Sequence, residues 1–84
     1  MKSIELSPKA AKYLEKLNEP MKSRIKSALL KLANEPPVGD IKNLSGRDGY
    51  RLRVGGYRIL FDMANDAIIV YDIGSRGQIY RGGN

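Results

Sequence analysis

The stretch YRLRVGGYRILF, at residues 50–61, constrains the fold more than any other part of the chain. Apolar and polar residues alternate on both sides of Gly55-Gly56, and such a glycine pair is typical of a two-residue hairpin turn with positive φ at both glycines. The turn sets which residues lie opposite one another across the two strands. The apolar pairs are Tyr50–Phe61, Leu52–Ile59 and Val54–Tyr57. We expect these six side chains on the sheet face that packs against helices.

Arginines occupy the other face of this predicted hairpin, which we call the arginine face. The same register places Arg53 directly opposite Arg58, with Arg51 two residues further along. Like charges in opposed positions destabilise a sheet by up to about 1 kcal/mol, and an anion held between them offsets that cost. Alternatively, acids of the chain neutralise the arginines, and those available are Asp48, Asp62 and Asp72. We favour an anion-binding face, because one or two acids do not cancel all the arginines of this half.

The basic residues change type along the chain. Its 15 lysines and arginines outnumber its 9 acids, which gives a net charge of +6. All the lysines lie between Lys2 and Lys42, and from residue 43 onward every basic residue is an arginine. Lysine suits a solvated helix face, whereas the planar guanidinium matches phosphate oxygens. This basic balance favours polyanionic partners, chiefly nucleic acid.

The composition excludes several kinds of site. The chain contains no cysteine and no histidine, which removes disulfides, thiolate metal sites and the commonest general base. No apolar run approaches the length of a membrane span, and the N-terminus lacks a signal-peptide core. We therefore expect a single domain over residues 1–84, located in the cytoplasm, with no metal, cofactor or membrane partner.

Two helices are predicted in the first half of the chain. After a short alternating strand over residues 3–7, Ser7-Pro8 pairs an N-cap residue with a proline at the first helical position. This helix is predicted to end near Asn18. Pro20 opens a second helix, whose apolar residues recur at helical spacing; they are Met21, Ile25, Ala28, Leu29 and Leu32. The short join between the helices predicts an antiparallel helical hairpin.

The second half of the chain is predicted to form a sheet. A loop over residues 36–48 precedes three strands, at roughly 49–54, 57–63 and 68–74. If the second hairpin turns through residues 65–67, Asp72 lies on the arginine face, across Leu60 from Arg51. The order β-α-α-β-β-β indicates an α+β fold, in which an N-terminal strand joins a mainly antiparallel sheet and the helical hairpin packs on one of its faces.

Two longer stretches, LSGRDGYRLRVGGYRILFD and IIVYDIGSRGQIYR, resemble the RelE/ParE superfamily of toxins from bacterial type II toxin–antitoxin modules. The resemblance is closer to the RelE branch and covers nearly the whole chain. It implies a RelE-like fold and a small, metal-independent endoribonuclease that cuts mRNA in the ribosomal A site. It also implies a cognate antitoxin that silences the chain. We expect this partner to be acidic and to lie across the arginine face.

The resemblance also implies a catalytic site. Carried over by motif, its residues are Arg51 and Arg53 in YRLR, Arg58 in YRIL, Arg76 after the last strand, and Tyr80 in GQIY. In this reading the 2′-OH of the RNA attacks the adjacent phosphate, and the arginines stabilise the charge on the phosphoryl oxygens. Tyr80 stacks on a base or orients the 2′-OH.

The identity of the proton acceptor stays open. The family often has lysines or a histidine where this chain has Arg51, Arg53 and Ser75, and arginine is a poor general base because it stays protonated. The remaining candidates are Tyr80 and the carboxylates Asp48 and Asp72. Catalysis that leans on positioning within the ribosome, with weak activity on free RNA, is a further alternative.

Two other functions remain open from the sequence alone. A ParE-like toxin binds DNA gyrase and cuts nothing, and a non-toxic basic module only binds nucleic acid. A gyrase inhibitor does not need the arginine face together with Arg76 and Tyr80. The absence of a flexible basic tail argues mildly against the simple nucleic-acid module. An mRNA nuclease acting on the ribosome is therefore our first prediction.

Overall fold

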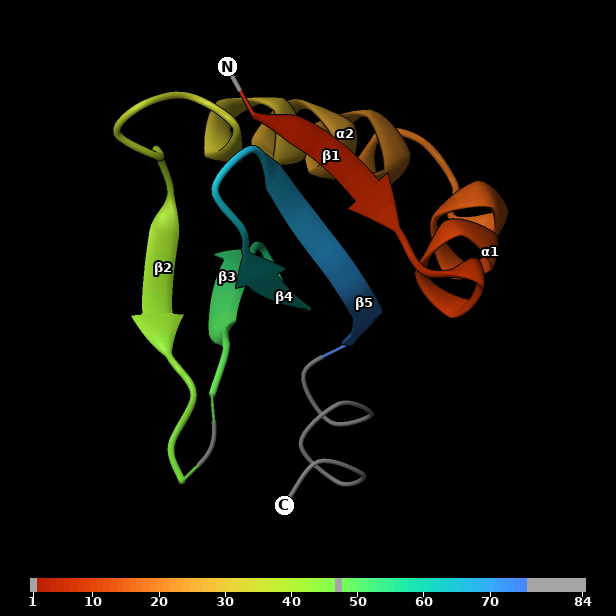
Figure 1. The fold of residues 1–84 in the computed structure, drawn as a ribbon. Helices are drawn as coiled ribbons and strands as arrows, with labels where there is room; N and C mark the ends of the chain where they lie inside the picture. Colours follow the sequence, from red (N-terminus) through yellow and green to blue (C-terminus); the bar gives the residue numbers. More distant parts are fainter. Residues whose placement is uncertain (1, 47, 76–84) are drawn as a thin grey trace.

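The computed structural model describes residues 2–46 and 48–75, which form two helices and a five-stranded sheet (Figure 1). The elements are β1 (Ser3–Leu6), α1 (Pro8–Lys16), α2 (Met21–Leu32), β2 (Asp40–Asn43), β3 (Tyr50–Val54), β4 (Tyr57–Met63) and β5 (Ala67–Ser75). The sheet order is β1-β5-β4-β3-β2, with β1 parallel to β5 and the other neighbouring strands antiparallel. The predicted α+β fold is confirmed. Within these residues, both helices fall short of the length and apolar character of a bilayer-spanning segment.

Helix α1 begins where the sequence predicts. The Ser7 Oγ accepts a hydrogen bond from the Ala10 N–H at 3.0 Å, and Pro8 occupies the first turn. This cap satisfies one of the amide donors that a helix leaves free at its start. The helix buries Ala10 and Leu14 in the core and ends at Lys16, slightly earlier than predicted.

Helix α2 begins without a side-chain hydrogen bond from its N-cap residue, Pro20. Instead, the carboxylate of Glu19 accepts hydrogen bonds from the N–H and the hydroxyl of Ser23, at 3.0 and 2.7 Å. These two bonds lower the pKa of Glu19, and a carboxylate at this end of a helix also complements the helix dipole. The apolar stripe of α2 buries Ile25, Leu29 and Leu32.

The core lies between the helices and one face of the sheet, which we call the core face. Its largest fully buried side chains are Phe61, Ile25, Leu32, Leu52, Ile59, Ile68 and Val70. The remaining three apolar hairpin residues, Tyr50, Val54 and Tyr57, pack against the same cluster and are partly buried. Tyr50 also stacks on Phe61, with ring centroids 5.5 Å apart. The expected placement of all six residues is therefore confirmed.

The β3–β4 hairpin has the predicted register, with Val54 opposite Tyr57 and Arg53 opposite Arg58. Its turn differs from the prediction in one respect. Gly55 has a φ of +58°, whereas Gly56 is not among the glycines of positive φ. A two-residue turn with positive φ at its first central position also connects antiparallel strands, so the register is kept.

Strand β2 was not predicted from the sequence. Its residues were expected to lie in a loop, but they pair antiparallel with β3 and place Asp40 opposite Arg53 and Lys42 opposite Arg51. The strand is only four residues long, with Ile41 as its one apolar side chain, so it shows too little alternation to signal a strand. It extends the sheet and brings an acid beside the arginine face.

Candidate anion-binding site

Two cross-strand rows of residues make up the arginine face. The first row is Asp40, Arg53, Arg58 and Gly74, and the second is Lys42, Arg51, Leu60 and Asp72. Residues paired directly across strands share a face, and successive residues of a strand alternate between faces. The structure therefore brings together the three arginines that the sequence assigns to one site.

These three arginines differ in exposure. Arg53 is exposed, whereas Arg51 and Arg58 keep only 5% and 3% of their accessible surface. Within the described residues, Nη1 of Arg51 has no hydrogen-bond partner. Leaving a buried donor unpaired costs on the order of 1–3 kcal/mol, and more for a charged group. This atom is therefore a candidate ligand for an anionic oxygen.

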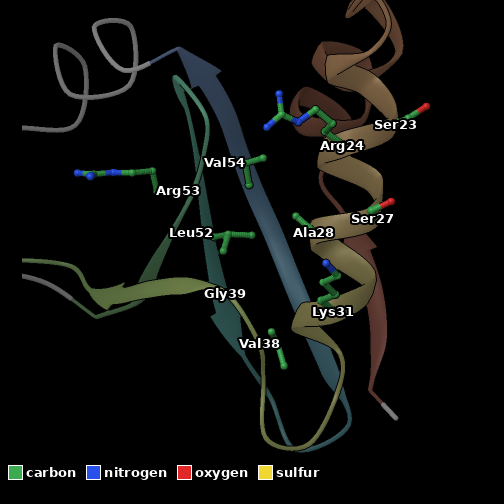
Figure 2. A pocket seen from close by; sticks show the side chains of 10 residues that line it. All are labelled: Ser23, Arg24, Ser27, Ala28, Lys31, Val38, Gly39, Leu52, Arg53 and Val54. Atoms are coloured by element: carbon green, nitrogen blue, oxygen red, sulfur yellow. The ribbon is translucent and has the colours of Figure 1, made fainter.

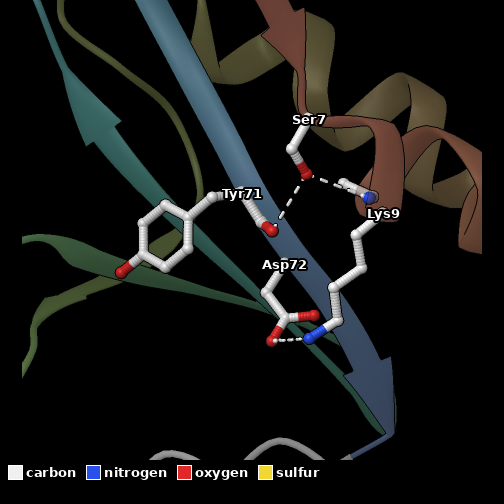
Figure 3. A network of polar contacts seen from close by, with 5 residues as sticks. Ser7, Lys9, Tyr71 and Asp72 are labelled. Carbon is white, nitrogen blue, oxygen red and sulfur yellow. Dashed lines mark hydrogen bonds and ion pairs between the residues drawn. The ribbon is translucent and has the colours of Figure 1, made fainter.

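Two acids form ion pairs close to the arginine face. The Oδ2 of Asp40 lies 3.9 Å from the Nε of Arg53, and both side chains are about half exposed, so the pair contributes little to stability. Asp72 lies on the predicted face, but its Oδ2 is 3.4 Å from the Nζ of Lys9 on α1 (Figure 3). The acid expected to neutralise Arg51 is thus engaged by a lysine. Sequence reasoning missed Asp40 because β2 was expected to be a loop.

A β-bulge decides which side chains of β5 lie on the arginine face. The β4–β5 hairpin closes with a backbone hydrogen bond from Ala64 to Ala67, around a turn shorter than predicted. The register then shifts after Leu60, which lies opposite Asp72, and Tyr71 is the extra residue of the bulge. Without the bulge, Leu60 would lie opposite Tyr71 instead. Asp72 therefore reaches the predicted face because of the bulge and not because of a longer turn.

Comparison with known proteins adds a family to this geometry. The family model for the ParE toxin of the type II toxin–antitoxin system parDE matches residues 4–80. The chain belongs to this family. No curated protein sequence matches the ParE-family chain.

Several solved structures resemble the ParE-family chain. A chain of the RelB–RelE antitoxin–toxin complex from Methanococcus jannaschii is 27% identical, with a TM-score of 0.77, and the match covers 95% of this chain and 99% of that one. The archaeal RelE–RelB complex from Pyrococcus horikoshii OT3 gives 24% identity, a TM-score of 0.78 and coverage of 92% and 97%. The isolated E. coli RelE toxin is 20% identical, with a TM-score of 0.76, and the match covers 96% of this chain and 93% of that one. These last two share the fold.

Two predicted site residues of the ParE-family chain, Arg76 and Tyr80, lie outside the described residues. The described part of β5 ends at Ser75, which is paired with Tyr57 at the start of β4. Arg76 is the next residue in the chain after β5, and β5 pairs with β4, the strand that carries Arg58. The assignment of Arg76 and Tyr80 to the site stays a prediction.

A groove of about 470 Å³ lies between α2 and β3 of the ParE-family chain (Figure 2). Leu52 and Val54 project into it from β3, opposite Ala28 of α2. Arg24 and Lys31 stand on the α2 side of this apolar surface, two helical turns apart. Arg53, although it contributes to the lining, points its side chain away from α2. The groove therefore combines an apolar floor with two cations.

The loop before β2 closes one end of the groove. A Cβ added to Gly39 would lie 2.7 Å from the Cδ1 of Leu52, and Gly39 has a φ of +147°. Both facts require glycine where the loop crosses Leu52. The neighbouring Val38 lines the groove with half of its surface exposed, so apolar surface is available to a partner here.

Proposed function

We propose that this ParE-family chain is a toxin that cuts mRNA on the ribosome, without a metal, by attack of the RNA 2′-OH on the adjacent phosphate. The observation that carries the proposal is the buried Arg51 donor, which lacks a partner in the described chain and lies on the same face as Arg53 and Arg58. A phosphodiester supplies the anionic oxygens that guanidinium groups bind best. The likeness to RelE structures supports the same proposal.

In the proposed reaction, the arginines act on charge and not on protons. The 2′-oxygen loses its proton and bonds to phosphorus as a 2′,3′-cyclic phosphate forms, while the P–O5′ bond breaks and the leaving 5′-oxygen takes up a proton. Attack adds negative charge to the phosphoryl oxygens, and fixed cations at that position stabilise the transition state more than the ground state. Arg53 and Arg58 lie directly opposite each other, so their mutual repulsion is relieved as the charge between them grows. Arg76 and Tyr80 are proposed to complete the site, with Tyr80 stacking on a base or orienting the 2′-OH.

The proton acceptor is one of three proposed groups, namely Tyr80, Asp48 and Asp72. One oxygen of Asp72 is already engaged by the Lys9 ammonium at 3.4 Å, which favours the other two. Asp48 is exposed and lies two residues before β3. A general base needs to be within hydrogen-bond reach of the proton it removes, so we expect only one of these acceptors to matter for the rate.

The second candidate function is inhibition of DNA gyrase without cleavage. The observation that favours it is the family match itself, since the matching family is that of the ParE toxin. The two functions separate in one experiment with the purified chain. We expect mRNA on programmed ribosomes to be cut, as detected by primer extension, while gyrase supercoils plasmid DNA normally. Inhibited supercoiling with intact mRNA would establish the gyrase function instead.

We also propose that an acidic antitoxin binds and silences this chain. The similar structures from M. jannaschii and P. horikoshii are complexes of RelE with RelB, and the net charge of +6 favours an acidic partner. The antitoxin is proposed to cover the arginine face, which would block the phosphate site directly.

The groove between α2 and β3 supports a second contact of the same antitoxin. In the described part of the chain, neither Arg24 nor Lys31 forms an ion pair. The two residues lie roughly 10 Å apart along α2 at 1.5 Å per residue. A partner segment with apolar side chains toward Leu52 and acids at that spacing matches the groove. In a helix this spacing corresponds to acids about seven residues apart. The expected sequence is therefore amphipathic and acidic.

A further inference from the structure

Tyr71, the extra residue of the bulge in β5, reaches across the sheet to the beginning of β3. A Cβ added to Gly49 would lie 3.2 Å from the Tyr71 hydroxyl oxygen and 3.1 Å from the Oδ1 of Asp62. Gly49 also has a φ of +116°, which favours glycine on its own account. The hydroxyl of Tyr71 therefore lies beside Gly49, at the start of β3 and two strands away from β5 in the sheet order, and Asp62 of the intervening strand β4 lies against the same position.

These contacts place the Tyr71 ring on the arginine face. Asp62 lies between Phe61, which is buried in the core, and Met63, which packs against it, so the Asp62 side chain points to the opposite face. Gly49 precedes Tyr50, which stacks on Phe61, and a side chain at position 49 would point the same way as that of Arg51. Because the Tyr71 hydroxyl lies against the Cβ position of Gly49, as the Asp62 carboxylate does, the Tyr71 ring shares their face.

The main chain around Tyr71 is held by the N-terminal part of the fold. The Ser7 hydroxyl donates a hydrogen bond to the Tyr71 carbonyl at 3.0 Å, and Lys9 pairs with the next residue, Asp72 (Figure 3). In the same view, the Tyr71 ring points away from α1. Bulges commonly re-aim a side chain next to a functional site. This one carries a half-buried aromatic ring onto the face that holds Arg51.

Gly49, beside which the Tyr71 hydroxyl lies, also lines a cavity of about 510 Å³. The other residues that line this cavity are Asn43, Leu44, Asp48, Tyr50, Asp62 and Met63. Gly49 immediately precedes β3 and is two residues from Arg51, a separation of roughly 7 Å in extended chain. The two carboxylates disfavour a phosphate in the cavity, whereas Arg51 favours one close by. Carboxylate oxygens do accept hydrogen bonds from the amino groups of nucleobases.

We propose that the Tyr71 ring and Asp62, at the edge of this cavity, form a nucleobase subsite next to the phosphate bound by Arg51. The base stacks on the Tyr71 ring, and Asp62 accepts a hydrogen bond from its exocyclic amino group. Single-stranded RNA is commonly held in this way, by cations on the phosphates and aromatic rings on the bases. The inference rests on the proposed RNA substrate. It adds a preference for bases with an amino group over uracil.

The first test measures binding without cleavage. The probe is a short single-stranded 2′-O-methyl RNA, which lacks the attacking 2′-OH, with one 2-aminopurine whose fluorescence falls on stacking. We expect Tyr71→Leu to weaken binding about tenfold and to abolish the fluorescence change, while Tyr71→Phe keeps both. Wild-type binding by Tyr71→Leu overturns the proposal. So does a Tyr71→Phe variant that is as weak as Tyr71→Leu, because the ring would then not be the cause.

Two controls separate stacking from phosphate binding. Tyr71→Leu leaves the phosphate contacts in place, so the dependence of its affinity on salt should match that of the wild type. Arg51→Met should reduce the salt slope by about one unit, as expected when one phosphate contact is lost. Asp62→Asn should narrow the preference for adenine, cytosine or guanine over uracil at the subsite. An unchanged preference in that variant overturns the assignment of Asp62.

A measurement on the wild-type chain keeps the proposal testable if Tyr71→Leu does not fold. RNA carrying 6-thioguanosine, a photoreactive base that keeps an exocyclic amino group, is cross-linked by light, and the adduct is mapped by mass spectrometry. We expect it on the β5 peptide that contains Tyr71, and a map without β5 overturns the proposal. If the wild-type chain stacks the probe but cuts no mRNA on ribosomes, the nuclease function fails and the subsite stands. If cleavage depends on Arg58 but RNA binding does not depend on Tyr71, the subsite fails and the nuclease function stands.

Discussion

The core face and the arginine face belong to the same sheet, but burial has opposite consequences on them. On the core face, Leu52, Ile59 and Phe61 are closed in by apolar neighbours, and their removal from water stabilises the fold. On the arginine face, Arg51 and Arg58 are almost as well hidden from solvent. Both carry charge, and removing a charged group from water costs free energy. For Arg51 the cost is increased by its Nη1 donor, which has no hydrogen-bond partner in the described chain.

The difference between the faces shows where this small domain carries a cost in stability. A chain of 84 residues buries a modest core and has little stability to spare. A buried cation with an unpaired donor is therefore expected only where a ligand offsets its cost. Substitutions on the core face should act mainly on folding, and substitutions on the arginine face mainly on RNA.

The largest expected effect is on the core side of this comparison. Phe61→Ala removes a fully buried ring that stacks on Tyr50, and we expect it to lower the free energy of unfolding by about 3–5 kcal/mol. Urea denaturation measures this value, with Val38→Ala, at a half-exposed position, as the control. A loss below about 1 kcal/mol would mean that Phe61 does not hold the two layers together.

Variants in the groove between α2 and β3 test whether antitoxin binding has a contact outside the core face and the arginine face. Reversing the charges of Arg24 and Lys31 to glutamate should weaken antitoxin binding about tenfold or more, because like charges then oppose the acidic partner. The association rate of the wild-type complex should fall as salt rises, and that of the variant should depend on salt less. Binding kinetics by surface plasmon resonance measures both. Reversal of Lys12 and Lys16, which are exposed on α1, is the matched control, and equal effects would argue against a specific groove.

A smaller effect is expected when the unpaired donor is removed. Arg51→Met keeps the unbranched stem and eliminates the buried charge, so the free energy of unfolding should stay level or rise by about 1 kcal/mol. Thermal and urea unfolding report the change. A marked loss of stability would show that Arg51 has a structural partner. It would contradict the view that the arginine face serves RNA binding and not folding.

The smallest expected effect concerns Glu19 at the start of α2. Hydrogen bonds from Ser23 lower its pKa below the ordinary value of 4.5. Its charge therefore stabilises the fold at pH values above 4.5, and this contribution is lost as the pH falls through the lowered pKa. Unfolding of Glu19→Gln at several pH values should differ slightly from the wild type near neutrality and converge with it in acid. Glu15→Gln on α1 serves as the control. A difference in unfolding free energy between Glu19→Gln and the wild type that stays constant with pH would contradict this role of Glu19.

The sequence predicts the contrast between the faces better than it predicts their surroundings. The Gly55-Gly56 turn and the alternation on both sides of it determine the register, so the positions of Leu52, Arg53 and Arg58 follow from local rules. Strand β2 escapes prediction because four residues with one apolar side chain form a strand only by pairing with β3. Such an edge strand depends on tertiary contacts that local propensity does not encode.

The remaining features of the site depend on contacts between distant parts of the chain. Lys9 reaches Asp72 only because α1 packs against the end of the sheet that carries β5. The bulge at Tyr71 has no local sequence signal. The position of the Tyr71 hydroxyl beside Gly49 is visible only in the folded structure. The burial of Arg51 is likewise a tertiary property, which alternation of residues along a strand does not predict.

The central claim is that the arginine face binds the phosphate that reacts, and Arg58→Met tests it most directly. The variant keeps an unbranched side chain opposite Arg53 and removes the charge, while Lys26→Met removes an equal charge from an exposed position of α2. Primer extension on programmed ribosomes gives the cleavage rate of each variant, and thermal melting confirms that each is folded. We predict a loss of about a hundredfold or more for Arg58→Met and an unchanged rate for Lys26→Met. Cleavage by a folded Arg58→Met variant at the wild-type rate would contradict the account.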